Sequence, residues 1–279
     1  ITVRCVERER LNVTQPALIR DVHQSHLDAG ADILLSNTFC ANAHQLGLAG
    51  CGDELEAINA EGAAAACDAA ANAGRTVYVF GRIGPLWLKR LDPIPMNETE
   101  RRAAYRAQII ALLRAPVDGL LIETMMDLTE ERLAILSARD CCDLPVAASI
   151  RYRVGADGRV TSPNDNPLTQ CLHGLSHAGA AIIGLNGTFS ADRLVAAARE
   201  IAAAARRPVW ARIAMATSSR TGGAREINTL DAATAAGEDL IAIGARIIGG
   251  DAGSTTEFIR RLSSHNTAKE PIDVSERVQ

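Results

Sequence analysis

Residues 119–138 read "GLLIETMMDLTEERLAILSA", and this stretch decides the fold of the chain. Its first part, Gly119–Met125, is an apolar run of strand length, and its last part, Leu128–Ala138, has the apolar period of a helix. Glu123 stands near the end of the apolar run. The stretch therefore predicts a buried strand that carries a carboxylate at its tip and leads directly into a helix.

The same alternation continues on both sides of this stretch. Further strands are predicted at Asp32–Thr38, Thr76–Gly84 and Pro145–Tyr152 and in "AIIGLNG", "PVWARIA" and "RIIGG", with helices between them such as Ala17–Gly30 and Glu98–Ala115. Counting the opening "ITVRCV" as the remnant of a strand gives eight strand–helix units. Such alternation requires a parallel sheet.

Eight units in a chain of 279 residues predict an α/β fold, a (β/α)8 TIM barrel in a single domain over residues 1–265. Residues 266–279 are polar without periodicity and are predicted to form a tail. A doubly wound open sheet is the alternative. Its nucleotide-binding version is not supported, because the chain has no Gly-x-Gly-x-x-Gly or Walker loop.

Composition limits the classes of partner. The chain is 47% hydrophobic and has a net charge of −4, which favours neither nucleic acid nor an anionic membrane. From the sequence, neither a signal peptide nor a membrane-spanning segment is expected. The seven cysteines are odd in number and include no Cys-x-x-Cys pair. They argue against a disulfide framework and for a reducing compartment, so a cytoplasmic protein is expected.

Functional groups of a barrel enzyme sit at the carboxyl ends of its strands. The polar residues predicted there are Asn37, Thr38, Glu123, Asn186 and Asp251. Glu123 is a candidate anchor for a substrate amine or a candidate acid/base, and the alternative is a carboxylate tied to a backbone amide or an arginine. The two asparagines and Thr38 either orient a ligand or cap turns.

Two cysteine and histidine patterns have the spacing of metal ligands. Cys40 and His44 lie in one predicted loop, but an isolated pair is more often a loop cysteine beside a solvated histidine. His173 and His177 share one face of a predicted helix, which packs outside a barrel and away from its mouth. Neither pair predicts a metal site by itself.

The strand ends also carry a family pattern. The chain resembles the homocysteine S-methyltransferases, which include the homocysteine-binding barrel of cobalamin-dependent methionine synthase and the betaine-dependent enzymes. The matching stretches are "LNVTQPALIRDVHQSHLDAGADILLSNTFCAN", "GRIGP", "GLLIETMMDLTE", "LSHAGAAIIGLNG" and "IIGGDAGSTTEFI". The resemblance implies a barrel that methylates the homocysteine thiol, with Glu123 helping to hold the homocysteine amine.

The resemblance also implies a zinc ion held by three cysteines, which lowers the pKa of the substrate thiol. The three matching positions here are Gly187, Asp251 and Ala252, so zinc is predicted to be absent or weakly bound. The family's Asp-Gly-x-Met-Gly turn is not found before "LNVTQP". The predicted catalytic residues are Glu123 and Asp251.

Three functions remain open from the sequence. The first is methyl transfer to a small thiol or amino-acid-like acceptor without the three-cysteine zinc, with Asn37, Thr38, Glu123 and Asn186 binding the substrate. The second is a catalytically silent barrel that binds a small molecule or a partner protein. The third is a hydrolase or lyase with a harder metal held by Asp251 and Asp165. The methyl donor and the oligomeric state stay open, as does a separate corrinoid or methyl-donor protein as partner.

Overall fold

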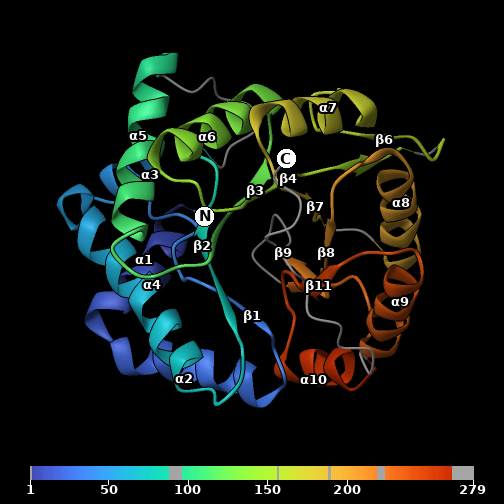
Figure 1. Ribbon diagram of the computed structural model, residues 1–279, viewed down its shortest axis with the longest axis horizontal. Coiled ribbons are helices and arrows are strands. Elements are labelled where there is room, and N and C mark those ends of the chain that lie inside the picture. Colours follow the sequence, from blue (N-terminus) through green and yellow to red (C-terminus); the bar gives the residue numbers. More distant parts are fainter. Residues whose placement is uncertain (1, 88–95, 156, 188–189, 219–223, 266–279) are drawn as a thin grey trace.

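One parallel sheet of seven strands forms the centre of the molecule and curls around its own concave face (Figure 1). The computed structural model describes residues 2–87, 96–155, 157–187, 190–218 and 224–265. Within them, the strands lie in the sheet in chain order, and every neighbouring pair is parallel. The strands are β1 Ile33–Leu35, β2 Tyr78–Ile83, β3 Gly119–Met125, β4 Val146–Ile150, β7 Ile182–Leu185, β8 Val209–Ile213 and β11 Ile247–Gly250.

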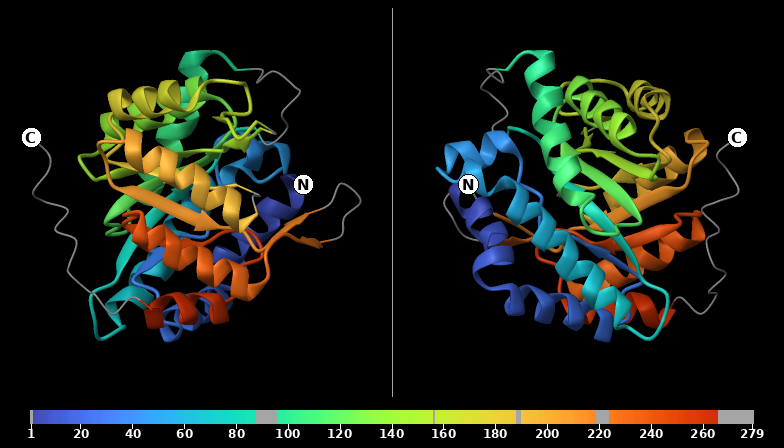
Figure 2. Two further views of the ribbon diagram at one scale, coloured as in Figure 1. Left: turned by 90° about the vertical axis from the view of Figure 1, so that its right-hand side faces the viewer. Right: turned by 60° about the vertical axis from the view of Figure 1, so that its left-hand side comes forward.

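Helices surround the convex side of this sheet, as the views from three directions show (Figures 1 and 2). They are α1 Thr2–Thr14, α2 Pro16–Asp28, α3 Ala43–Leu48, α4 Leu55–Ala71, α5 Glu98–Leu112, α6 Leu128–Cys141, α7 Leu168–Ala178, α8 Ala191–Ala204, α9 Leu230–Ala242 and α10 Thr256–His265, with a short 3₁₀ turn, η1, at Gly52–Glu54. Two small antiparallel hairpins join β5 Arg153–Val154 to β6 Val160–Thr161 and β9 Ala216–Ser218 to β10 Ala224–Glu226.

The beginning of the chain differs from the prediction. The strand remnant expected in "ITVRCV" is wrong, because residues 2–14 form the helix α1. Val6, Glu9 and Asn12 are buried at a spacing of three, which is the period of one helix face and not of a strand. This face packs against α4. The short β-branched run at the start therefore yields to the helical pattern that follows it.

The predicted barrel is confirmed as a single α/β domain with a curled parallel sheet, but the sheet is not closed. Within the described ranges, β1 pairs only with β2 and β11 only with β8, so these two strands are its edges. The doubly wound alternative does not fit, since such sheets reverse their strand order at a switch point and this sheet follows the chain throughout.

An apolar layer covers the concave face of the sheet. It consists of Phe80, Leu121, Ala147, Ile182 and Trp210, one residue from each of five adjacent strands. The rings of Phe80 and Trp210 meet edge to face, with centroids 5.2 Å apart. A larger apolar core lies between the convex face and the helices. Both faces are thus buried, as expected for parallel strands.

Local signals explain where several elements begin and end. Asn97 and Glu100 form a reciprocal capping box at the start of α5. Gly179 ends α7 at φ 104°, a left-handed conformation that glycine adopts without a steric penalty. No helix among the described residues has the length and apolarity to cross a membrane. The predicted tail, residues 266–279, lies outside the described residues.

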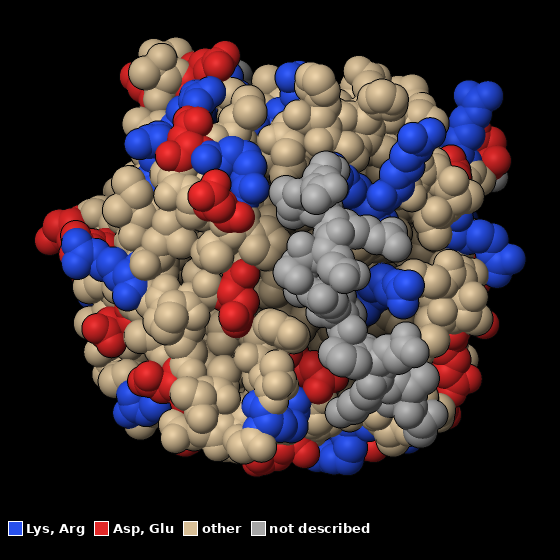
Figure 3. Space-filling view, in the orientation of Figure 1, with Lys and Arg blue, Asp and Glu red and all other residues tan. Residues whose placement is uncertain are grey.

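Charges on the surface are mixed in sign. The face drawn in Figure 3 carries both basic and acidic side chains around its rim. No single-sign field of the kind that attracts nucleic acid spans this face, which agrees with the small net charge of −4.

Candidate active site

Three charged side chains lie on the concave face, one layer beyond the apolar layer. Arg82, Glu123 and Arg212 each follow a member of that layer by two residues, on β2, β3 and β8. Because side chains alternate between the two faces of a strand, this spacing returns them to the concave face. All three stand near the carboxyl ends of their strands, where barrel enzymes bind their substrates.

Glu123 is the centre of this cluster and is fully buried. Its Oε1 accepts a hydrogen bond from Nε of Arg82, and its Oε2 accepts one from Nη1 of Arg212. Burial alone would raise the pKa of this carboxyl. The charges and hydrogen bonds of Arg212 and Arg82 outweigh burial and lower the pKa of Glu123 to about 2. The carboxylate is therefore ionised throughout the physiological pH range.

Asp251 joins the cluster through Arg212. Its Oδ1 lies 3.6 Å from Nη2 of Arg212, and Nε of the same guanidinium donates to the carbonyl of Gly250 at 2.9 Å. The structure therefore brings Glu123 and Asp251, the two residues predicted as catalytic, onto one guanidinium group. We call Arg82, Glu123, Arg212 and Asp251 the ion-pair cluster; its two cations and two anions balance.

Arg82 is the more accessible of the two arginines. Its side chain is 27% exposed, whereas that of Arg212 is 10% exposed. The guanidinium carbon of Arg82 lies 4.8 Å from the ring centroid of Phe39, within reach of a cation–π contact. The space among Leu121, Trp210 and Arg212 is too narrow to admit a water molecule. A ligand would therefore reach the cluster from the side of Arg82.

Asn186 links the tips of two strands beside the cluster. Its Oδ1 accepts from the hydroxyl of Ser149 at 2.7 Å, and its Nδ2 donates to Oγ1 of Thr124 at 2.7 Å. Thr124 has φ 62°, a left-handed conformation that is strained for a β-branched residue. The strain occurs directly after Glu123, and strained backbone of this kind concentrates at functional sites.

Asn37 and Thr38 occupy a different place from the other predicted residues. Nδ2 of Asn37 donates to the carbonyl of Arg8 and to Oδ1 of Asn12, both at 2.9 Å, so this side chain is directed at α1. The Thr38 hydroxyl donates to the carbonyl of Arg82 at 2.6 Å. Both side chains thus hold the loop after β1 in position. Thr38 meets the cluster only through the backbone of Arg82.

Of the three positions at which the resemblance implies zinc ligands, only Asp251 has a side chain that could bind a metal. Gly187 has no side chain and Ala252 only a methyl group. Asp251 offers a carboxylate that is already paired with Arg212. The carbonyl of Ala252 accepts from the amides of Met215 and Ala216 at 2.8 and 3.0 Å. A set without sulfur or nitrogen donors does not fit a zinc site of the three-thiolate kind.

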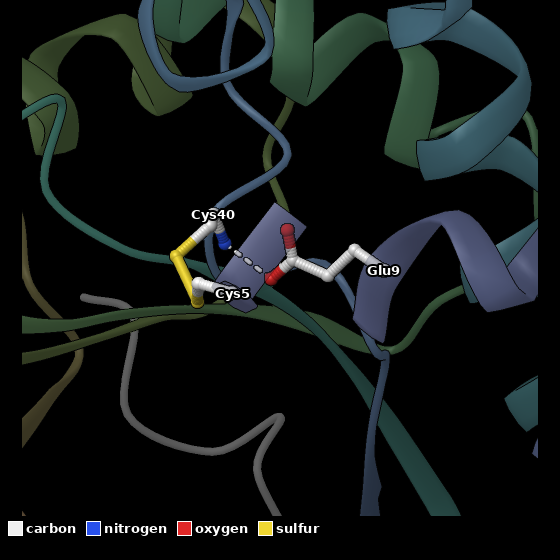
Figure 4. A group of neighbouring side chains, drawn as sticks. All are labelled: Cys5, Glu9 and Cys40. Carbon is white, nitrogen blue, oxygen red and sulfur yellow. Dashed lines mark hydrogen bonds between the residues drawn. A yellow bond between two sulfur atoms is a disulfide. The ribbon is translucent and has the colours of Figure 1, made fainter. Parts of the chain in front are cut away.

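A second group of reactive side chains lies where α1 meets the loop after β1 (Figure 4). Cys5 of α1 and Cys40 are joined in a disulfide with a Cα–Cα distance of 6.1 Å. Glu9, one turn after Cys5, accepts a hydrogen bond at Oε1 from the amide of Cys40. Burial raises the pKa of Glu9 to about 8, although that hydrogen bond and the charge of Arg82 act against it.

The bridge corrects one expectation about the cysteines. Cys51, Cys67, Cys141, Cys142 and Cys171 are free, in line with the absence of a disulfide framework, but Cys5 and Cys40 are bonded to each other. The sequence alone does not pair them, because Cys5 and Cys40 come together only when residues 2–14 form a helix and not a strand. The rings of His44 and Trp87 are tilted by 41° with their centroids 4.6 Å apart, and His44 is not in the group with Cys40.

The harder metal site that the third alternative would place at Asp251 and Asp165 has no support in the described part of the chain. Asp165 pairs with Arg153, and Asp251 pairs with Arg212. The group of three or more possible ligands found among the described residues is Cys5, Glu9 and Cys40.

Sequence reasoning missed Arg82 and Arg212 as members of the site. A signal was present, because each is a cation inside an otherwise apolar strand, in "YVFGRI" and "VWARI". A buried arginine at such a position is costly unless it pairs with an acidic side chain. Both arginines pair with Glu123.

A curled parallel α/β sheet defines a broad class of folds that host many functions. The comparison with known families narrows this class: residues 3–265 match the model of the homocysteine S-methyltransferase family. The chain belongs to this family.

Known proteins agree with this assignment. The methionine synthase of Mycobacterium tuberculosis is 26% identical over 267 residues, which cover 92% of this chain and 22% of that enzyme. The S-methylmethionine–homocysteine S-methyltransferase of Rattus norvegicus is 31% identical over 179 residues, 63% of this chain and 44% of the relative. The chain thus spans less than half the length of these relatives.

Among solved structures, the metallated form of the homocysteine methyltransferase MmuM from Escherichia coli has the same fold, with a TM-score of 0.76. The two chains are 20% identical, and the match covers 94% of this chain and 88% of that chain.

Proposed function

We propose that this protein transfers a methyl group to a small thiol or another amino-acid-like acceptor bound at the carboxyl ends of the strands. The observation that carries the proposal is the ion-pair cluster, which places two anions and two cations at the strand tips of a homocysteine S-methyltransferase family member. An amino acid carries one charge of each sign, so it complements such a cluster.

Glu123 and Asp251 are the candidate partners of the acceptor's ammonium group, and Arg82 is the candidate partner of its carboxylate. A carboxylate has about four lone-pair sites. Each oxygen of Glu123 uses one of them for an arginine, which leaves lone pairs that could accept from a further donor. Arg82 is the more exposed cation and is the first charge that an incoming ligand meets. Asn37, Thr38 and Asn186 keep their proposed role as substrate-binding residues.

The proposed reaction does not use the family's three-cysteine zinc, because Gly187, Asp251 and Ala252 replace the three thiolates. When bound, such a zinc ion lowers the pKa of the acceptor thiol. Without it, a thiol acceptor reacts only through the fraction that ionises unaided, so methylation of homocysteine is expected to be slow. We propose no other cofactor, and a separate corrinoid or methyl-donor protein remains a proposed partner.

The cellular location of this activity and the closure of the barrel are also proposals. A cytoplasmic location and a closed eight-stranded barrel were expected from the sequence. Closure requires one more strand between β1 and β11, which are the edges of the described sheet.

A methyl-transfer assay tests the proposal. The purified chain is given S-methylmethionine, S-adenosylmethionine, betaine or methylcobalamin as donor and homocysteine or other small amino acids as acceptor. The same assay and an elemental analysis are run on the variant Gly187→Cys, Asp251→Cys, Ala252→Cys. We expect slow transfer by the parent to at least one acceptor, with no zinc at the family position, and zinc uptake at that position by the triple variant.

Two results would contradict the proposal. Fast methionine formation by the parent, with zinc bound, would mean that other residues supply the metal. No transfer from any donor would favour the second candidate, a silent barrel that binds a small molecule or a partner protein. The loss of all three thiolate positions is the observation that favours this candidate. Calorimetry with amino acids then separates a binding protein from one with no ligand.

A further inference from the structure

We propose that Cys5, Glu9 and Cys40 form a binding site for one zinc-like divalent cation when the Cys5–Cys40 disulfide is reduced. One candidate ligand atom of each residue lies within 4.8 Å of those of the other two. None of these residues occupies a position at which the family resemblance implies zinc. The site does not depend on the proposed methyl transfer, because metal binding is measured without any substrate.

The backbone geometry suits two cysteine ligands on one ion. Two thiolates at about 2.3 Å from a tetrahedral zinc ion lie about 3.8 Å apart. The Cα atoms of Cys5 and Cys40 are 6.1 Å apart, so their sulfur atoms reach that separation by side-chain rotation once the bridge is broken. Both residues are anchored, Cys5 on α1 and Cys40 in the loop after β1, so no large movement of the chain is required.

Glu9 gives an indication, independent of the two cysteines, that a cation binds here. Its side chain is 2% exposed, and its Oε1 accepts from the amide of Cys40. Its Oε2 is buried and has no hydrogen-bond partner among the described residues. A buried carboxylate oxygen without a partner is costly unless something pairs with it. A cation between Glu9 and the two sulfur atoms would satisfy this oxygen.

The donor set defines the class of metal. Two thiolates and one carboxylate favour a soft or borderline ion such as Zn²⁺ over Mg²⁺ or Ca²⁺, which prefer oxygen ligands alone. Three protein ligands leave the fourth tetrahedral position to a water or an exogenous thiol. Arg82 of the ion-pair cluster acts electrostatically on Glu9.

Formation of the site has two steps that balance. A dithiol reductant gives two electrons and two protons to the Cys5–Cys40 bond, yields two thiols and itself becomes a disulfide. The cation then forms two metal–sulfur bonds and one metal–oxygen bond. Each thiol releases its proton to solvent, and so does Glu9 where it is protonated, so that Glu9 binds as the carboxylate. Oxidation of the two cysteines back to the disulfide removes both sulfur ligands at once, so the site exists only while Cys5 and Cys40 are reduced.

The test compares the full chain in its oxidised and reduced forms. The protein is incubated with a phosphine reductant, then with Zn²⁺ or Co²⁺ alone, freed of excess metal and analysed for bound ion. We expect one ion per reduced chain and none per oxidised chain. Co²⁺ should give the thiolate-to-metal charge-transfer absorption of a tetrahedral sulfur site. Reduced chain without bound metal, or equal metal in both forms, would overturn the proposal.

Variants assign the ligands. Cys5→Ser and Cys40→Ser should each lower metal affinity by more than about 100-fold, since loss of a supporting residue alone costs 10–100-fold. Glu9→Gln keeps the size of the side chain and should lower affinity by at least about 10-fold. Cys141→Ser, a free cysteine beside Cys142, is the matched control and should bind like the parent. Metal loss in Cys141→Ser together with retention in Cys5→Ser would place the ion elsewhere.

Discussion

Glu123 is held between two guanidinium groups at a point where no water reaches it. An exposed ion pair contributes little to stability, but a buried charge that loses its partner is strongly destabilising. Arg212 is buried against Glu123, and its second acidic partner among the described residues is the more distant Asp251. The stability of the molecule should therefore depend on Glu123 whether or not it binds a substrate.

The variant Glu123→Gln keeps the shape of the side chain and removes its charge. We expect it to lower the free energy of unfolding by about 3–5 kcal/mol, because Arg82 and Arg212 are left with one anion between them. It should also weaken the binding of an amino-acid ligand. Chemical denaturation and ligand titration measure the two effects separately.

Glu56→Gln is the matched control for this variant. Glu56 pairs with Arg114 at 2.7 Å, but its side chain is 63% exposed. Solvent screens such a pair, so its loss should change stability by no more than about 1 kcal/mol. Equal effects of the two substitutions would show that the buried cluster contributes no more to the free energy of unfolding than an exposed ion pair does.

His23 is a buried histidine in the face of α2 formed by Ile19, His23 and Leu27. Burial, with a smaller effect of His26, lowers its pKa from the ordinary 6.5 to about 4. Between these two values the unfolded chain binds a proton that the folded chain does not. Stability is therefore complete above pH 6.5 and falls as the pH is lowered toward 4.

Denaturation at pH 7.5 and pH 5 checks this expectation. His23 should account for about 2 kcal/mol of the stability lost between these pH values, at about 1.4 kcal/mol for each pH unit below 6.5. His23→Leu should remove that part of the pH dependence. His173→Gln, which removes an exposed histidine, should keep it. A pH profile of His23→Leu that matches the parent would refute the assignment.

At the scale of elements, the disulfide ties α1 to the loop after β1. It joins residues 35 positions apart, and the closure of a loop of this length stabilises a fold by about 3–4 kcal/mol. Reduction in the presence of a chelator should lower the unfolding midpoint in denaturant accordingly. The chelator prevents bound metal from compensating. An unchanged midpoint would mean that α1 is held by its packing against the neighbouring helices, without a contribution from the disulfide.

Elements with a local signal could be predicted from the sequence, and contacts between distant elements could not. The unit β3–α6 follows from one continuous stretch, and its tip carries Glu123 as expected. The partners of Glu123 are 41 and 89 residues away, so their place depends on strand register across the sheet. Cys5 and Cys40 lie close together only because α1 is a helix. The β-branched residues at the start of α1 favour a strand, so the sequence did not predict this helix.

At the scale of the whole molecule, the sheet has a centre and two ends. All residues of β4 are buried, and so are all but one of β3, whereas every residue of β11 is only partly buried. β1 has three residues and one neighbour. The order of the strands follows the chain, so each strand is held mainly by the strands before and after it in sequence.

The open edges should therefore appear as a gradient in backbone amide exchange with deuterium. Local opening that begins at β1 or β11 breaks one strand pairing, while opening at β3 or β4 breaks two and uncovers the apolar layer. We expect the slowest exchange in β3 and β4 and progressively faster exchange toward both ends, as mass spectrometry of peptides would resolve. Uniform protection across all seven strands would instead mean that the sheet opens only as a single cooperative unit.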